Sequence, residues 1–373
     1  MHIDADNKRF QDFIEETEKK LDMEITVEKC PSNADNRQAK ISTILASGDK
    51  NIDLISVNDE MISEFKHKGY LEPLEKNVMT EEVRDSFPQK YLESICEENG
   101  HIYSVPFQMD IMMFWVNQEL LKQAGLDEIK NTGDFDILQK SLKNPDQYAY
   151  GDAWENTHVY NSLSQFVNFW GGDYFDWTDP KTKDAARYMK SMLDEKNTSP
   201  AQFVDQYEQM EEKFIRGKYG CVFMYTSALG TFLDADVYGK NKIHMAPLPV
   251  FHKKKATNIA TWQYVLNNAS QNKDAAVRFL QYAAGYEGST EYAKIMKSYP
   301  ARVDVIENED IDLEGIDMIR KYLREYTLNA RPLCENSMGA VSDMGKLFQG
   351  YVLGQCEEDS FFEQAQNCIN TYY

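Results

Sequence analysis

The sequence predicts an α/β fold in which helices alternate with parallel strands. Apolar residues recur with the helical period over residues 10–21 and then alternate with polar residues over residues 23–28. This change from a period of 3.6 to a period of 2 separates a helix from a strand. Further helix and strand patterns follow at short spacing as far as Gly69. Such spacing is typical of layered α/β proteins.

The first elements are predicted from periodicity and end signals. One face of the first helix carries Phe10, Phe13, Ile14, Thr17 and Leu21. A strand is predicted over residues 23–28, a helix over residues 33–47 and a buried strand over residues 52–57. Asn58 then caps a helix that Gly69 ends.

The rest of the chain is predicted to mix strands with many helices. Strands are expected at 102–106, 111–116, 219–225 and 258–266, and helices at 118–124 and 273–284. Residues 134–216 read as mostly helical, and the tail from residue 312 as three helical segments separated by Pro332 and Gly354. No repeat or linker divides the chain, which favours two lobes joined by several crossovers.

Composition excludes several classes of partner. The 373 residues contain 40 Lys+Arg and 61 Asp+Glu, a formal net charge of −21. A field of that sign repels phosphate backbones and anionic lipid surfaces, so neither nucleic acid nor a membrane surface is an expected partner. The same charge favours a soluble monomer. No stretch approaches the roughly 18 apolar residues of a membrane span.

Catalytic and metal-binding motifs are missing from the sequence. It contains no G-x-S-x-G, H-E-x-x-H, G-x-x-x-x-G-K-[ST] or G-x-G-x-x-G pattern. The six cysteines include no C-x-x-C pair, and the six histidines never fall at metal-ligand spacing. No enzyme, cofactor or metal site is therefore expected. The many carboxylates leave a glycosidase pair possible.

Aromatic residues in polar surroundings are the positive signal. Trp154 lies in the segment Gly-Asp-Ala-Trp-Glu-Asn, Tyr225 precedes Thr and Ser, and Trp262 lies between Thr and Gln. A sugar packs its CH-rich face on a flat ring while its hydroxyls bind amides and carboxylates. The alternative is that each ring closes the core of its own lobe and keeps its polar edge wet.

Several segments together resemble the extracellular solute-binding proteins of carbohydrate ABC importers. The resemblance rests on residues 40–55, 69–74, 100–107, 114–126, 214–224, 246–249, 274–280 and 299–302, which follow in the family's order. The stretch Phe-Trp-Val-Asn-Gln-Glu-Leu-Leu-Lys-Gln-Ala-Gly-Leu at 114–126 is the most specific of them. Each piece alone is weak, and their order makes the resemblance strong.

The resemblance implies a bilobal periplasmic-binding-protein-like fold with a ligand cleft between two α/β lobes that close by a hinge. The lobes are expected to comprise residues 1–109 with 268–304, and 110–267 with 305–373. The crossings are expected near 108–110, 267–269 and 303–308.

Two features depart from the family. Relatives begin with a strand before the first helix, of which only Met1-His2-Ile3 are present here. Where relatives carry a Gly-Gly pair, this chain has Ala260-Thr261-Trp262.

These considerations predict the ligand site. Its expected residues are Trp154, Tyr225 and Trp262 as stacking rings, with Gln108, Asp110, Asn156, Arg302 and Asn58 as polar partners. Gln108 and Asp110 lie at the first implied crossing, and Arg302 lies beside the third. Asn58 ends a strand, where open α/β sheets place ligands, although it also suits the cap of its own helix.

The expected function is the capture of an oligosaccharide outside the cytoplasm and its delivery to the permease subunits of an importer. The protein is expected to be lipid-anchored or periplasmic, with its leader absent from this chain. A peptide, a polyamine or a metal chelate is an alternative ligand, since clustered acids attract cations. A glycoside hydrolase is a further alternative.

Overall fold

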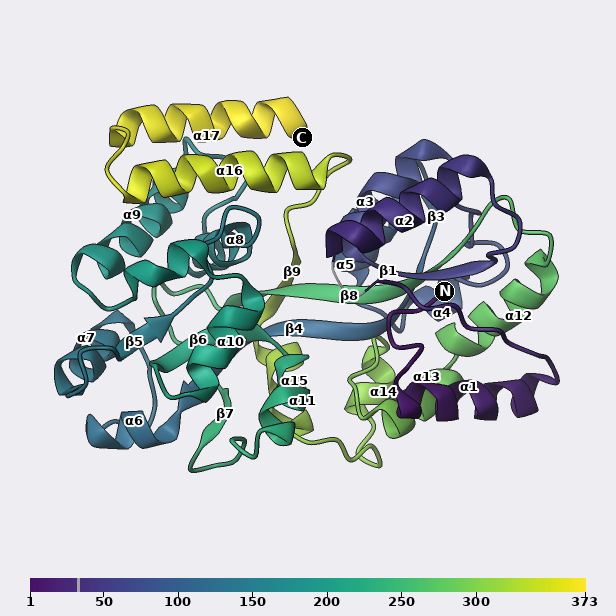
Figure 1. The fold of residues 1–373 in the computed structure, drawn as a ribbon, viewed down its shortest axis with the longest axis horizontal. Helices are drawn as coiled ribbons and strands as arrows, with labels where there is room; N and C mark the ends of the chain where they lie inside the picture. The colour runs from purple at the N-terminus through teal and green to yellow at the C-terminus, as the bar shows by residue number, and fades with distance from the viewer. Residues whose placement is uncertain (32–33) are drawn as a thin grey trace. The chain divides into compact units, whose positions relative to one another are not determined.

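The computed structural model describes residues 1–31 and 34–373 and divides the chain into two compact units (Figure 1). Unit 1 comprises residues 1–110, 260–316 and 333–335, and unit 2 comprises residues 111–259, 317–332 and 336–373. In this part of the chain, no helix is long and apolar enough to cross a membrane.

Unit 1 is built around two long strands that it shares with unit 2. Its helices and strands are α1 (Lys8–Leu21), α2 (Ala34–Ser47), β1 (Leu54–Asn58), α3 (Asp59–Phe65), η1 (Lys66–Lys68), α4 (Glu81–Arg84), α5 (Gln89–Tyr91), η2 (Leu92–Cys96), β2 (Glu97–Glu98), β3 (His101–Ile102), the first part of β4 (Val105–Asn117), the last part of β8 (Ala256–Leu266), α12 (Lys273–Ala284), α13 (Tyr286–Met296) and α14 (Val303–Glu307). Helices α1 and α12 both pack against α13.

Unit 2 contains the remaining elements. They are α6 (Gln118–Gln123), α7 (Thr132–Ser141), β5 (Tyr148–Gly151), α8 (Val159–Trp170), α9 (Pro180–Asp194), η3 (Pro200–Val204), α10 (Tyr207–Ile215), β6 (Tyr219–Tyr225), α11 (Ala228–Asp234), β7 (Ile243–Ala246), α15 (Ile316–Glu325), β9 (Thr327–Ala330), α16 (Ser337–Val352) and α17 (Glu358–Tyr372). Helices α16 and α17 lie side by side, drawn in yellow in Figure 1.

Local end signals place many of these elements where the sequence predicts them. The Asn58 side chain accepts a hydrogen bond from the Met61 amide and begins α3, and Asn117 begins α6 in the same way. Gly69 adopts the left-handed conformation (φ 68°) that ends the helical segment. Strand β6 and helix α12 have the predicted bounds. The α/β class is confirmed.

The strand pairing is mostly antiparallel, and the prediction of parallel strands is wrong for these pairs. In unit 1, β1 pairs antiparallel with β8. In unit 2, β4 pairs antiparallel with β6 and with β7, whereas β5 with β6 and β8 with β9 are parallel. Strand β9 is a short element that the sequence analysis missed.

Two predicted strand boundaries also need correction. Residues 102–106 and 111–116 were expected to form two strands, but β4 runs unbroken from Val105 to Asn117. The predicted strand over residues 23–28 is not formed, although its side chains alternate between half-buried and exposed. No backbone–backbone hydrogen bond of Ile25, Thr26 or Val27 exists in the described part of the chain, and a strand requires such bonds.

The chain passes between the units at positions set by these long strands. It crosses at 110–111 within β4, at 259–260 within β8 and at 316–317 at the start of α15, with a short return at residues 333–335. The second crossing precedes the expected 267–269 because the end of β8 pairs with β1 in unit 1 and its start pairs with β9 in unit 2. Residues 303–308 contain α14 and lie wholly within unit 1.

Stability is expected to decrease at acidic pH because His2 is buried uncharged. Its ring stacks on Phe10 with the centroids 3.8 Å apart, and its Nδ1 accepts a hydrogen bond from the Asp4 amide. Burial holds the pKa of His2 well below its ordinary value. Below about pH 6.5 the unfolded chain therefore binds a proton that the folded chain does not, and the free energy of unfolding decreases until the folded-state pKa is reached.

Urea unfolding of the parent and of His2→Phe tests this expectation. The variant keeps a stacked ring and removes the titrating group. Between about pH 7 and about pH 5, the parent should lose up to about 1.4 kcal/mol per pH unit more than the variant. Identical pH slopes would contradict it.

Candidate ligand-binding site

In unit 1, Asn58 and Trp262 lie opposite each other on paired strands β1 and β8. The Asn58 Oδ1 accepts from the Met61 amide at 3.3 Å, and its Nδ2 donates to Glu60 Oε2 at 2.8 Å. Asn58 thus caps α3, the role that the sequence analysis offered as the alternative. Its position beside a half-buried tryptophan still places an amide next to a ring.

Arg37 of α2 completes this group. Its guanidinium carbon lies 5.3 Å from the centroid of the Trp262 ring, within the range of a cation–π contact. Burial lowers the pKa of the Arg37 guanidinium, which is 4% exposed. The sequence analysis missed Arg37, because a single arginine in a helix carries no signal of the ring it packs against.

Removal of the Asn58 cap should destabilise unit 1 moderately. Asn58→Ala leaves the Met61 amide without its acceptor, and loss of an N-cap costs about 0.5–2 kcal/mol. Asn58→Asp keeps an acceptor oxygen at the helix N-terminus and should retain most of the stability. Thermal unfolding of both variants beside the parent measures the difference. If Asn58→Ala melts with the parent, the cap does not stabilise α3.

Gln108 and Asp110 lie on one face of β4, two residues apart, at the end of the unit 1 segment. The Gln108 Oε1 accepts a hydrogen bond from the Tyr292 hydroxyl at 2.8 Å, and the Gln108 side chain is half-buried. Asp110 is buried, with 7% of its surface exposed. Both are polar groups on a continuous strand where the chain leaves unit 1, whereas the sequence analysis placed them between two strands.

Arg302 holds parts of unit 1 together. Its guanidinium donates to both carboxylate oxygens of Asp304, to the Ala284 carbonyl at 2.7 Å and to the Ser86 hydroxyl at 2.7 Å. The side chain is 7% exposed. In place of the expected ligand contact, the structure therefore shows a buried guanidinium whose donors are used within the unit.

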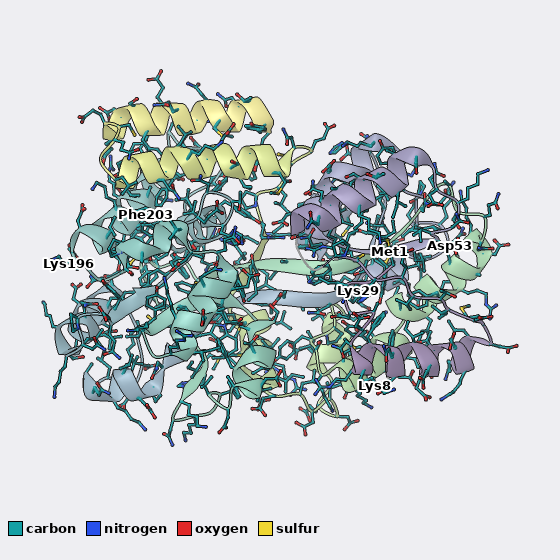
Figure 2. The ribbon with its side chains drawn as sticks, viewed as in Figure 1. Met1, Lys8, Lys29, Asp53, Lys196 and Phe203 are labelled. Atoms are coloured by element: carbon teal, nitrogen blue, oxygen red, sulfur yellow. The ribbon has the colours of Figure 1, made fainter. Side chains whose placement is uncertain are left out.

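Trp154 lies in the core of unit 2 and has no exposed surface. Its indole Nε1 donates to Asp152 Oδ2 at 2.8 Å. Its ring packs edge-to-face on Phe203, which Figure 2 labels, and on Phe348, with centroid separations of 5.6 Å and 5.4 Å. This packing corresponds to the core role that the sequence analysis gave as the alternative to a stacking platform.

Asp152 organises the surroundings of Trp154. Its carboxylate accepts hydrogen bonds from the Tyr150 hydroxyl, the Trp154 indole, the Ser162 hydroxyl and the Ala153 amide. Burial raises the pKa of Asp152, and these hydrogen bonds act in the opposite direction. A carboxylate that satisfies four donors in the core has a structural role.

Asn156 lies close to helix α16. A Cβ at Gly345 would come within 2.0 Å of the Asn156 carbonyl oxygen, so only glycine permits this approach. The side-chain Oδ1 of Asn156 is buried and has no hydrogen-bond partner among the described residues. A buried acceptor of this kind requires a donor from water or from a ligand.

Tyr225 ends strand β6 and is 9% exposed. Its hydroxyl donates to Asn161 Oδ1 at 3.0 Å, and the Arg331 guanidinium carbon lies 5.9 Å from its ring centroid. Arg331 also donates to the Tyr160 hydroxyl. A cavity of about 20 Å³, with room for one water, adjoins Tyr225, Asn161 and His158. Asn161 and Arg331 were not found from the sequence.

Unit 2 also contains a half-buried acid–histidine pair, Glu155 and His158, of which His158 lines this cavity. Burial alone would raise the pKa of Glu155, but hydrogen bonds from Thr157 and His158 outweigh it and lower the pKa. His158 Nδ1 lies 3.4 Å from Glu155 Oε2. Among residues 1–31 and 34–373, no three metal-ligand side chains form a cluster that could hold an ion.

The sequence of the chain is similar to those of known solute-binding proteins. Residues 4–290 match the family model of the bacterial extracellular solute-binding proteins. A relative from Sinorhizobium fredii, named a probable amino-acid ABC transporter periplasmic-binding protein, is 24% identical over 239 residues, which are 61% of this chain and 54% of that protein. The chain thus spans about half the length of this curated relative, and 60% of the length of relatives from Brucella.

Solved structures match almost the whole chain. A solute-binding protein from Thermotoga lettingae bound with α-D-tagatose has a TM-score of 0.84 at 18% identity, covering 99% of this chain and 97% of that one. An ABC substrate-binding protein from Listeria monocytogenes in complex with cycloalternan has a TM-score of 0.80 at 17% identity, covering 99% and 97%. The bilobal periplasmic-binding-protein-like fold expected from the sequence is confirmed.

Proposed function

The chain belongs to the bacterial extracellular solute-binding proteins, and on this basis we propose that it captures an oligosaccharide for an ABC importer. It would bind the sugar outside the cytoplasm and deliver it to permease subunits without chemical change and without a cofactor. The sugar complexes of the Thermotoga and Listeria proteins support the ligand class.

The observation that carries the proposal is that each unit holds an aromatic ring beside a guanidinium and an amide. In unit 1 these are Trp262, Arg37 and Asn58. In unit 2 they are Tyr225, Arg331 and Asn161. A ring binds the CH-rich face of a sugar, and amides and guanidinium groups bind its hydroxyls.

Three residues expected from the sequence add polar groups to their own units. Gln108 and Asp110 supply an amide and a carboxylate in unit 1, and Asn156 supplies its buried acceptor in unit 2. Trp154 and Arg302 stay outside this set, because their polar atoms are bonded within their own units.

A thermal-shift panel tests the ligand class. Oligosaccharides of different length and linkage, monosaccharides, amino acids, peptides and polyamines are each added at a fixed concentration. A ligand present at 100 times its Kd should stabilise the folded chain by about 2.7 kcal/mol, which is a clear rise in Tm. The proposal requires at least one oligosaccharide to give this rise. That oligosaccharide should also be recovered chemically unaltered after the incubation. Release of smaller sugars during incubation would indicate a glycoside hydrolase.

An amino acid is the second candidate ligand, favoured by the name of the Sinorhizobium relative. The net charge of −21 also suits a cationic compound such as a polyamine. The same panel separates these classes. A rise in Tm with an amino acid or a polyamine, and none with any sugar, would replace the oligosaccharide as the ligand.

We extend the proposal to a lipid-anchored monomer. The strong negative charge supports a monomeric state, since like charges oppose self-association. Light scattering coupled to size exclusion should give the mass of one chain with and without ligand. Fractionation of the native host should recover the protein with membranes, on their outer side.

A further inference from the structure

Trp262 is flanked on strand β8 by two buried polar residues. Thr261 is 2% exposed and Gln263 has no exposed surface, whereas Trp262 between them is half-buried. Successive side chains of a strand point to opposite faces, so Thr261 and Gln263 share one face of β8 and Trp262 lies on the other. The partners of these two side chains therefore restrain the backbone that carries the ring.

Both side chains bind the same atom, the hydroxyl oxygen of Tyr91 in α5. The Thr261 hydroxyl donates to this oxygen at 2.8 Å, and the Gln263 amide Nε2 donates to it at 3.1 Å. The Gln263 Oε1 accepts from the Cys96 thiol at 3.1 Å and from the Ser104 hydroxyl. We call these five residues the Tyr91 network, and each of them is at most 2% exposed.

The segment that carries Tyr91 is itself held by the buried side chain of Lys66. The Lys66 ammonium donates to the carbonyls of Ser94, Ile95 and Glu97 at 3.4 Å, 3.1 Å and 3.0 Å. These carbonyls lie in and directly after the helical turn η2, which follows α5. Because the end of this turn is tied to η1, the Tyr91 hydroxyl is a fixed point for β8.

A buried polar network of this kind restricts geometry. Apolar side chains of similar size would bury the same face of β8 without any need for partners. Buried hydroxyl and amide groups must instead meet their partners at set distances and angles, so few arrangements of β8 on α5 and η2 satisfy all of them. The backbone on either side of Trp262 is thereby restrained.

We propose that the Tyr91 network holds the Trp262 ring in the orientation that receives a sugar, so that Thr261 and Tyr91 are positioning residues of the site. This rests on the proposed function, in which Trp262 binds the ligand. The cation–π contact of Arg37 restrains the ring, and the network restrains the backbone beneath it. A ring that is held before binding loses less conformational freedom on binding, which raises the affinity.

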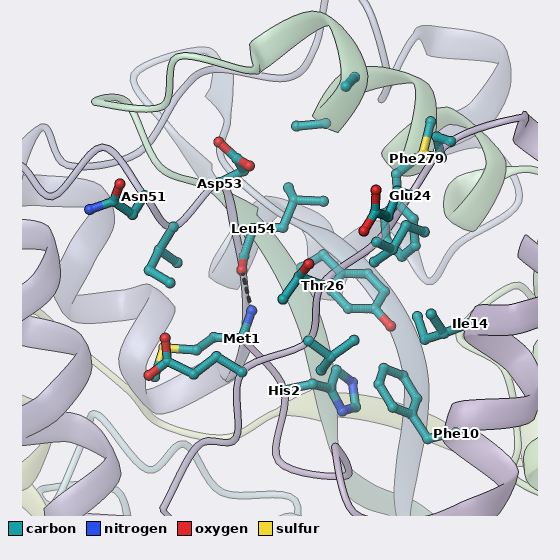
Figure 3. A pocket seen from close by; sticks show the side chains of 18 residues that line it. Met1, His2, Phe10, Ile14, Glu24, Thr26, Asn51, Asp53, Leu54 and Phe279 are labelled. Carbon is teal, nitrogen blue, oxygen red and sulfur yellow. Dashed lines mark hydrogen bonds between the residues drawn. The ribbon is translucent and has the colours of Figure 1, made fainter. Parts of the chain in front are cut away.

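The Tyr91 network is separate from the large cavity of unit 1. That cavity has a volume of about 460 Å³ and is lined by other residues, among them Leu54, Tyr264 and Phe279 (Figure 3). Removal of the Thr261 hydroxyl therefore changes the bond to Tyr91 and leaves the lining of this cavity as it is.

Matched variants of Thr261 test the proposal. Thr261→Val keeps the branched shape and removes the hydroxyl that donates to Tyr91, whereas Thr261→Ser keeps a hydroxyl. Thr182→Val is the control for stability, because Thr182 of α9 is also fully buried and donates to the Asp173 carbonyl at 2.8 Å in unit 2. The near-UV circular dichroism of Trp262 is taken as the difference between each chain and the same chain with Trp262→Phe.

Thr261→Val should reduce the near-UV signal of Trp262 by about half or more. It should also raise the Kd about three- to tenfold for the oligosaccharide that gives the largest rise in Tm in the panel. Thr261→Ser should keep the signal and the Kd of the parent. Thr182→Val should lower the Tm and leave both unchanged. In the Trp262→Ala chain, Thr261→Val should change the Kd by less than about twofold, because its effect acts through the ring.

An unchanged Trp262 signal in Thr261→Val would overturn the proposal. So would an equal loss of this signal in Thr182→Val, or an equal rise in Kd from Thr261→Val with and without the Trp262 ring. Failure of the proposed function gives a different result. In that case no oligosaccharide binds, or Trp262→Ala binds it like the parent, while the circular dichroism still shows whether Thr261 positions the ring.

Discussion

Replacement of Trp154 by alanine should lower the free energy of unfolding by about 3–5 kcal/mol, as for other large aromatic residues removed from a core. The ring has no exposed surface and packs on Phe203 and Phe348, so its loss leaves a cavity. It also removes one of the four donors to Asp152, whose carboxylate is buried. Urea unfolding measures the loss.

Two comparisons make this result specific. Phe175, an aromatic residue of the same unit, is 44% exposed, and Phe175→Ala should cost about 1 kcal/mol or less. At a temperature where Trp154→Ala is folded, its affinity for the ligand found in the panel should lie within about threefold of the parent. A variant of unchanged stability with much weaker binding would show that Trp154 faces the ligand.

The residues next to Trp154 in the sequence do not determine whether its ring is buried. The polar neighbours of Trp154 predict a ring that stacks on a sugar, yet Asp152 is itself buried and binds the indole. A sequence shows which groups lie near in the chain, and it does not show which way a loop turns them. For the same reason Arg37 and Arg331, brought to rings by tertiary packing, gave no signal.

Elements whose limits depend on their own residues were predicted well. Asn58 and Asn117 mark helix starts because an Asn side chain can accept from the amides that follow it. Pairing between distant segments was predicted poorly. Strand β1 pairs with β8, about 200 residues later, and only the fold decides that this pair is antiparallel. The segment 23–28 has the side-chain alternation of a strand, but Ile25, Thr26 and Val27 make no backbone–backbone hydrogen bond with any residue that the structure describes.

Among the binding-site variants, Trp262→Ala should have the largest effect on affinity. Stacking of a nucleobase on an aromatic side chain is worth roughly 1–3 kcal/mol by alanine substitution, and we take the same magnitude for a sugar packed on Trp262. The Kd should therefore rise on the order of 10- to 100-fold. The ring is half-buried and contacts Arg37, so the loss of stability should be smaller than for Trp154→Ala.

Trp262→Phe is the matched control, because it keeps a flat ring on β8 and should retain most of the affinity. Arg37→Gln removes the cation beside the ring while leaving the ring itself, and it should weaken binding less than Trp262→Ala does. Calorimetric titration with the ligand found in the panel, run beside melting curves, separates affinity from stability. If Trp262→Ala binds within about twofold of the parent, a difference below roughly 0.5 kcal/mol, Trp262 does not stack on the ligand.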